Sequence, residues 1–189
     1  MPIATAITAA EYLAGPEDRR RTELVDGVVI VHEPLARHQY VVFDLAVALR
    51  EWACAQPGRG RVTLPLDVRL DEYNVFAPDI LWYAEGRAPG RDAQRPSPTP
   101  DLAVEVRSRS TWRYDIGAKK AGYEHGGLPE LWLVDTAADV VLAFRRSSPK
   151  APDFDVALEF AREDVLSSPL LPGFALTLHE LFGSEEITT

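Results

Sequence analysis

The chain has 189 residues and a hydrophobic content of 46%, which excludes an intrinsically disordered protein and suffices for one compact domain with its own core. Its net charge of −9, from 20 basic and 29 acidic residues, excludes a global attraction to nucleic acid, so any such binding would need a local basic surface. Cys54 is the sole cysteine, which excludes an intramolecular disulfide and a thiolate zinc site.

The sequence gives no sign of a membrane or export segment. No apolar run reaches the roughly 18 residues that span a bilayer. The N-terminus has neither the basic region nor the apolar core of a secretory signal. We therefore expect a cytoplasmic protein that forms a single domain over residues 1–189.

The first part of the chain predicts a short helix, a hairpin and a long helix. Thr8 is placed to cap a helix over 9–13. The pair Asp26-Gly27 between two apolar runs predicts a tight turn, and hence a hairpin over 23–31. Apolar residues at helical spacing predict a long helix over 36–55. Between the short helix and the hairpin, the arginines at 19–21 are typical of a solvated link, or alternatively of a phosphate contact.

The middle of the chain alternates strands and helices. Strict alternation predicts a half-buried strand over 61–70, although Pro65 is unfavourable in a central strand. Further strands are predicted over 77–83 and 101–107, and the proline-rich segment 86–100 between them predicts an exposed loop, either a linker or a substrate-contacting flap. A helix over 112–125 and a buried strand over 131–134 follow. This order predicts an α/β domain, a mixed sheet flanked by helices, with its core at about 36–135.

The C-terminal part predicts strands that extend this sheet. Residues 139–144 are expected to pair with the strand at 131–134, and residues 154–160 to form an edge strand. A short helix over 178–182 closes the chain.

Two of the central strands carry a carboxylate that a buried strand does not need. These are Asp79 and Glu105, and burying a carboxylate is costly unless it is paired or binds a metal. If the two strands are neighbours, strand alternation lets both side chains converge at one end. Two close carboxylates repel each other unless a cation lies between them, and oxygen ligands without a Cys or His cluster favour Mg²⁺ or Mn²⁺ over zinc. A nearby lysine would orient or deprotonate a water, or neutralise developing charge.

Each of these residues also has a purely structural interpretation. Asp79 follows a proline and could cap a turn. Glu105 could pair with Arg107 on the same strand or with a neighbouring arginine. Asp115 and Lys119 stand four residues apart with the acid first, which is the favoured order for a plain ion pair on a helix.

The motifs taken together resemble a known group of nucleases. Pro78-Asp79 followed by Glu105-Val106-Arg107 resembles the PD-(D/E)xK signature, and the order of elements is similar to the core of that superfamily. A wider set of segments resembles the bacterial "putative restriction endonuclease" family of the Uma-two type. These segments are 23–27, 38–39, 77–79, 101–106, 108–111, 115–119, 131–135 and 168–174.

This resemblance implies a restriction-endonuclease-like fold with an extra N-terminal hairpin and extra C-terminal strands. It also implies a metal-dependent endonuclease that hydrolyses DNA phosphodiester bonds. Asp79 and Glu105 would bind Mg²⁺ or Mn²⁺, Lys119 from the following helix would assist the water, and Glu23 would be a supporting acid.

If the chain acts on DNA, basic residues near these acids would contact the phosphate backbone. The candidates for substrate binding are Arg107, Arg109, Arg113 and Lys120. His38 on the long helix is a further candidate, although it could also be a structural histidine. A homodimer would supply the two sites needed to cut both DNA strands.

Two other hypotheses stay open, and Arg107 bears on the first of them. It stands where the superfamily signature carries lysine, and arginine cannot act as a base. One alternative is a catalytically degenerate nuclease fold that serves as a nucleic-acid or protein interaction module. The other is a metal hydrolase that acts on a small phosphorylated molecule.

Overall fold

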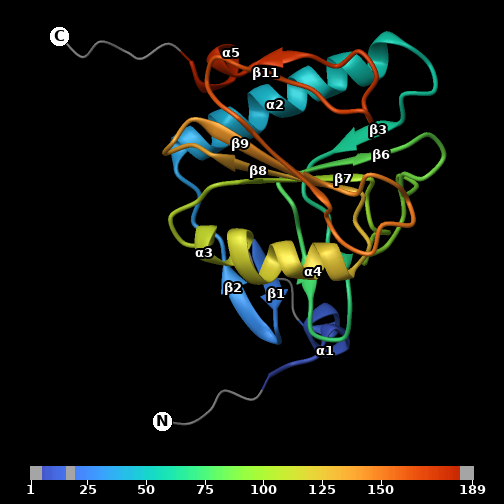
Figure 1. Cartoon of the computed structure of the whole chain (residues 1–189). Coiled ribbons are helices and arrows are strands. Elements are labelled where there is room, and N and C mark those ends of the chain that lie inside the picture. Colours follow the sequence, from blue (N-terminus) through green and yellow to red (C-terminus); the bar gives the residue numbers. More distant parts are fainter. Residues whose placement is uncertain (1–5, 16–19, 184–189) are drawn as a thin grey trace.

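The computed structural model describes residues 6–15 and 20–183, which form a layered α+β structure (Figure 1). Arg19 lies outside the described residues. The helical segments are α1 (Ala9–Ala14), α2 (Ala36–Ala55), α3 (Trp112–Tyr114), the π-helical η1 (Asp115–Lys119), α4 (Lys120–His125) and α5 (Leu178–Phe182). The predicted helices over 9–13, 36–55, 112–125 and 178–182 are thereby confirmed. None of the described helices combines the length and the apolarity needed to cross a membrane.

A six-stranded mixed sheet forms the centre, in the order β10-β9-β8-β7-β6-β3. Its strands are β3 (Arg61–Thr63), β6 (Ile80–Tyr83), β7 (Leu102–Val106), β8 (Glu130–Asp135), β9 (Val140–Arg145) and β10 (Val156–Phe160). The pair β7 and β8 is parallel, and the other neighbours are antiparallel. Strand β6, which Asp79 directly precedes, pairs with β7, which carries Glu105, so the condition for these two side chains to converge is met.

A smaller sheet lies beneath the central one, in the order β2-β1-β5-β4. Its strands are β1 (Thr22–Val25), β2 (Val28–Val31), β4 (Val68–Arg69) and β5 (Val75–Phe76), and a separate ribbon joins β11 (Val165–Leu166) to β12 (Leu176–Thr177). The predicted hairpin is confirmed. Its turn residues Asp26 and Gly27 both have positive φ, 49° and 74°, as a tight turn between twisted strands requires.

The prediction of one continuous strand over 61–70 is wrong. Strand β3 ends at Thr63 in the large sheet, and β4 begins at Val68 in the small one. Pro65 lies in the break, where its missing N–H removes a ladder hydrogen bond. The apolar alternation nevertheless continues because Leu66 and Val68 pack into a different apolar cluster.

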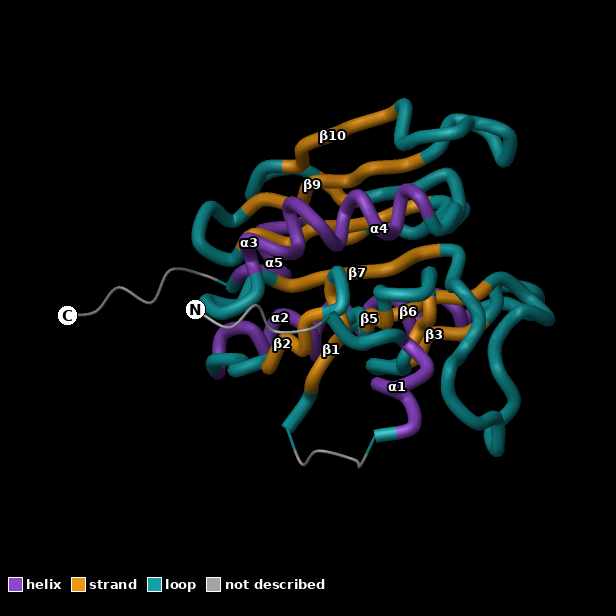
Figure 2. The backbone as a smooth tube through the Cα atoms, turned by 90° about the horizontal axis from the view of Figure 1, so that it is seen from below, coloured by secondary structure: helices purple, strands orange, loops and turns teal. Residues whose placement is uncertain are grey.

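The two faces of the large sheet bury different layers. Helices α2 and α5 cover one face, where Val104 and Val106 of β7 pack in the larger core. Helix α4 runs along the other face (Figure 2), where Ala103 packs with Tyr123. The alternation expected along the 101–107 strand is therefore confirmed. It turns Glu105 toward α4 and the small sheet.

Candidate active site

The four residues predicted to be catalytic are brought together from four separate elements. Glu23 lies on β1, Asp79 directly before β6, Glu105 on β7 and Lys119 at the end of η1. Each is at most 3% exposed. Such deep burial of charged side chains is sustained only when they are paired.

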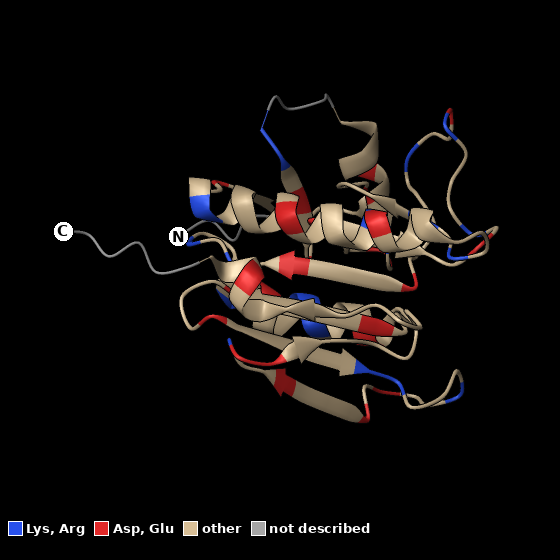
Figure 3. Ribbon diagram, turned by 90° about the horizontal axis from the view of Figure 1, so that it is seen from above, with Lys and Arg blue, Asp and Glu red and all other residues tan. Residues whose placement is uncertain are grey.

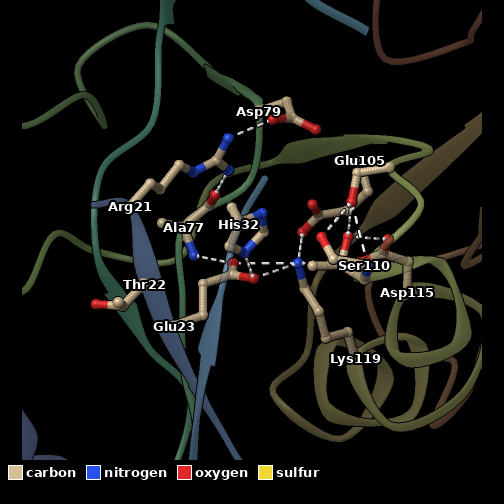
Figure 4. Close-up of polar contacts among 12 residues, drawn as sticks. Arg21, Thr22, Glu23, His32, Ala77, Asp79, Glu105, Ser110, Asp115 and Lys119 are labelled. Carbon is tan, nitrogen blue, oxygen red and sulfur yellow. Dashed lines mark hydrogen bonds and ion pairs between the residues drawn. The ribbon is translucent and has the colours of Figure 1, made fainter. Parts of the chain in front are cut away.

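Lys119 is the centre of the cluster (Figure 4). Its Nζ lies 2.8 Å from Glu23 Oε2, 2.8 Å from Glu105 Oε1 and 3.1 Å from Asp115 Oδ1. The prediction of an Asp115–Lys119 ion pair is confirmed, but the pair is buried in this cluster rather than on a solvated helix surface. The intervening turn is π-helical, a local irregularity that is frequent at functional sites.

Asp79 is held by a separate set of donors. Its Oδ1 accepts a hydrogen bond from Arg21 Nη1 at 2.5 Å, and its Oδ2 accepts one from the Val106 backbone N–H at 2.8 Å. His38 on α2 brings Nε2 to 3.3 Å from the same Oδ2. Arg21 also donates to the Ala77 carbonyl. The interpretation of Arg21 as part of a solvated link is therefore wrong, because its side chain is only 25% exposed and is bound to Asp79.

A further ring of groups orients these carboxylates. His32 Nε2 lies 2.5 Å from Glu23 Oε2, and the Ala77 N–H donates to Glu23 Oε1 at 2.5 Å. The Tyr123 hydroxyl donates to Glu105 Oε1 at 2.5 Å. Sequence reasoning missed Arg21, His32 and Tyr123 as site residues. For Tyr123 a signal existed, since it lies one helical turn after Lys119 and therefore on the same face.

The cluster has an excess of negative charge. Glu23, Asp79, Glu105 and Asp115 face two permanent cations, Lys119 and Arg21. Four carboxylates and two cations leave a formal charge of −2 when the two neighbouring histidines are neutral. Such an excess must be relieved by bound protons or by a further cation.

The pKa values of the acids reflect this excess. Burial raises the pKa of Glu105 to about 8, and the nearby charges of Glu23, Asp115 and Asp79 add to the rise against the opposing effect of Lys119. Burial would also raise the pKa of Glu23, but Lys119 and the His32 hydrogen bond hold it down at about 2. The pKa of Lys119 lies above its usual range, because three carboxylates outweigh the effect of burial.

The donor set suits a hard divalent cation. Asp79 directly precedes β6 and Glu105 lies on its neighbour β7, and the excess charge of −2 equals what one Mg²⁺ would neutralise. Within residues 6–15 and 20–183, no group of three or more His, Cys, Asp or Glu side chains is arranged to hold a metal ion. Mg²⁺ is usually held by one or two protein carboxylates, with waters and substrate phosphates completing its shell.

The residues predicted to bind substrate lie in different places. His38 is buried beside Asp79, whereas Arg107 donates to both oxygens of Asp135 at 2.8 Å and stacks on Trp112. The alternative that Arg107 pairs with Glu105 is therefore wrong.

The other basic candidates also lie outside the buried cluster. Lys120 lies over the Phe144 and Phe154 rings, Arg113 donates to the Tyr114 hydroxyl, and Arg109 is exposed. Acidic and basic residues are interspersed over the whole ribbon (Figure 3).

Comparisons with known proteins agree with this fold. A model of the Uma2 family, described as "Putative restriction endonuclease", matches residues 9–179. A crystal structure of a "putative nuclease belonging to DUF820" from Anabaena variabilis superposes with a TM-score of 0.77, at 18% sequence identity, over 93% of this chain and 97% of that one. No curated protein matches the sequence.

Proposed function

Because the chain belongs to the Uma2 family of "putative restriction endonucleases", we propose that it is a metal-dependent endonuclease that hydrolyses DNA phosphodiester bonds. The observation that carries this proposal is the buried group of four carboxylates around two permanent cations, Lys119 and Arg21, since the neighbouring histidines add positive charge only when protonated. A structural ion-pair network would be expected to balance its charges, since uncompensated buried charge is costly. A site built for a divalent cation is expected to carry this excess.

In this proposal Asp79 and Glu105 hold the metal, with Mg²⁺ or Mn²⁺ as the ion. When bound, such an ion lowers the pKa of a water molecule and stabilises charge on a phosphoryl oxygen. The protein's own part is to hold the two carboxylates in place, through the Val106 N–H for Asp79 and the Tyr123 hydroxyl for Glu105. Glu23 contributes indirectly, because its carboxylate holds Lys119 in place.

Lys119 serves in this proposal as a fixed positive charge rather than as a base. Its pKa lies above the usual range, so it keeps its proton at neutral pH. A protonated lysine donates hydrogen bonds and stabilises negative charge that develops on the phosphate or on the attacking oxygen. Of the roles open to this lysine, the geometry favours charge neutralisation and orientation of a water over deprotonation.

The proposal also names the residues that contact the DNA substrate. DNA binding is proposed to use His38 beside Asp79, together with the surface cations Arg107, Arg109, Arg113 and Lys120. Arg107 is already paired with Asp135, so it would contact DNA only with the part of its guanidinium that is left free. A homodimer, a cytoplasmic location and the use of the 86–100 loop as a flap belong to the same proposal.

One observation favours a second candidate, a nuclease fold that binds nucleic acid or protein without cutting. Arg21 and Lys119 already contact Asp79 and Glu105, which are the two proposed metal ligands. If these pairs persist in the presence of metal, they block the ligand positions. The fold would then serve only for binding.

Calorimetric titration with Mg²⁺ and Mn²⁺ tests the first candidate. The wild type is expected to bind metal, and both Asp79→Asn and Glu105→Gln are expected to abolish the signal. Glu130→Gln is the matched control, because Glu130 is an equally buried carboxylate on the neighbouring strand but lies outside the cluster. Cleavage of supercoiled, linear and single-stranded DNA should follow the same pattern.

Two results separate the candidates. Metal binding and DNA cleavage that both depend on Asp79 and Glu105 would support the nuclease. Folded proteins that bind DNA without cutting it, and bind no metal at about 10 mM with or without DNA, would support the interaction module.

A further inference from the structure

A concave site lies on the central sheet, away from the buried acidic cluster. It is a cavity of about 600 Å³, within the size range of small-molecule sites. Asp101, directly before β7, and Glu130, the first residue of β8, line it. Its lining also includes three arginines, Arg87, Arg145 and Arg146, and the apolar side chains of Pro129, Pro169 and Leu170.

The sheet separates this cavity from the acidic cluster. In the parallel register of β7 and β8, Leu102 pairs with Glu130 and Glu105 pairs with Leu133. The two carboxylates therefore stand three residues apart along the sheet, roughly 10 Å at 3.3 Å per residue. The cavity is thus a separate site.

Arg145 is the notable group in this cavity. It is half-buried at the end of β9, and its side chain has no hydrogen bond or ion pair with any other described residue. Its cross-strand neighbour is Glu130, which would be the natural partner. Burial raises the pKa of Glu130, and Arg145 opposes this rise only through its charge, because the carboxylate oxygens are already occupied. Oε1 accepts from Trp132 Nε1 at 2.6 Å and Oε2 accepts from Ser168 Oγ at 2.7 Å.

Of the two further guanidinium groups in the cavity, Arg146 adds positive charge, whereas the charge of Arg87 is balanced by a carboxylate. Arg87 pairs with Asp101, and Arg146 is fixed by three backbone carbonyls, those of Leu128, Ala151 and Glu124. Carbonyls do not cancel the charge of Arg146. The cavity therefore presents unbalanced positive charge in a chain whose net charge is −9.

We propose that this cavity binds a small organic phosphate of about mononucleotide size, with Arg145 as the main phosphate ligand. Guanidinium groups match phosphate oxygens in a two-pronged geometry, which gives strong and directional bonds. The hydroxyl of Ser148, which also lines the cavity, adds a hydrogen-bond donor. Apolar walls from Pro129, Pro169 and Leu170 suit a flat organic body rather than a bare ion.

Adenosine monophosphate, adenosine and inorganic phosphate are the probes for a calorimetric test on the full chain. We expect saturable one-to-one binding of the monophosphate, and binding at least about tenfold weaker for each of the two fragments. Arg145→Gln should weaken binding of the monophosphate by about tenfold or more without lowering the unfolding midpoint of the free protein. Arg37→Gln, which removes an exposed guanidinium from a surface ion pair, is the matched control and should bind as the wild type does.

The outcomes decide this proposal independently of the nuclease proposal. No saturable binding at about 10 mM probe, or binding that survives Arg145→Gln, overturns it. The monophosphate should bind Asp79→Asn as tightly as the wild type, because Asp79 is not in the cavity. Binding that disappears in Asp79→Asn would place the probe in the acidic cluster and would also overturn the cavity assignment.

Discussion

Two buried glutamates on neighbouring parallel strands behave differently. Glu130 on β8 accepts one hydrogen bond on each oxygen, from Trp132 and from Ser168, both neutral donors. Glu105 on β7 accepts from Lys119 and Tyr123 on one oxygen, and three other carboxylates lie near enough to affect its pKa. Both side chains are at most 2% exposed, so burial alone does not distinguish them.

The difference lies in how the surrounding charge is balanced. Each oxygen of Glu130 has a hydrogen-bond donor that no other carboxylate shares, as is typical of a structural polar group in a core. Glu105 shares one lysine with Glu23 and Asp115, so the cluster keeps an excess of negative charge. A buried acid therefore indicates function where several carboxylates share too few cations, and not where a single carboxylate has neutral donors of its own.

The largest expected effect is the loss of the shared lysine. Lys119→Met leaves three buried carboxylates without their common cation, and breaking a buried pair in this way typically costs about 3–5 kcal/mol of unfolding free energy. Urea denaturation measures the loss. Lys120→Met is the matched control, since the neighbouring lysine is only partly buried and should cost less than about 1 kcal/mol.

The same variant also sharpens the comparison of the two glutamates. Millimolar Mg²⁺ should restore part of the stability of Lys119→Met, because these acids lack a cation in the variant and a bound divalent ion would supply the positive charge. Equal losses in the two lysine variants would contradict the view that the cluster depends on Lys119.

A second prediction concerns the pH dependence of stability in the metal-free protein. The folded pKa of Glu105 is about 8, above its ordinary value of 4.5, so the folded state retains a proton that the unfolded state has lost. Its contribution is complete below pH 4.5 and is lost as the pH rises to about 8. Glu105→Gln should remove this decline, which can reach a few kcal/mol at about 1.4 kcal/mol per pKa unit. Urea denaturation from pH 5 to 9 checks it.

Glu23 should show the opposite sign. Its folded pKa of about 2 lies below 4.5, so its contribution is complete above pH 4.5 and is lost as the pH falls toward 2. Glu23→Gln should therefore flatten the acid side of the curve. Because the charge of Glu23 also helps to raise the pKa of Glu105, this variant should reduce the alkaline decline without removing it. Asp44→Asn, an exposed substitution on α2, is the control and should leave both sides as they are. Identical curves for the two glutamate variants would contradict the assigned roles.

Much of this arrangement could be predicted because it follows from local pattern. Alternation along the strand predicts that Glu105 and Ala103 share a face, and the Asp26-Gly27 turn predicts the hairpin that carries Glu23. The resemblance of the motifs to the nuclease family adds the order of the strands and helices in the core. These are the parts that depend on residues close in sequence, or on a fold order already known.

The parts that could not be predicted depend on contacts between distant residues. Arg21 reaches Asp79 across 58 positions, and Lys119 reaches Glu23 across 96. No periodicity in either segment encodes such a contact. The split of the 61–70 strand had a local signal in Pro65, but the alternation on both sides of it concealed the change of sheet.

The smallest expected effect concerns Arg21 and separates the two candidate functions. The Arg21 guanidinium pairs with Asp79 at 2.5 Å, and the charges of Glu23 and Glu105 also act on it, so it lies where a metal held by Asp79 and Glu105 would compete with it. Arg21→Gln should therefore tighten Mg²⁺ binding, by about tenfold or 1.4 kcal/mol, while it weakens DNA binding. Calorimetry measures the first effect and a DNA filter assay the second, with Arg37→Gln as the control. If Arg21 instead fills this position in a fold that only binds, the variant should show no metal affinity.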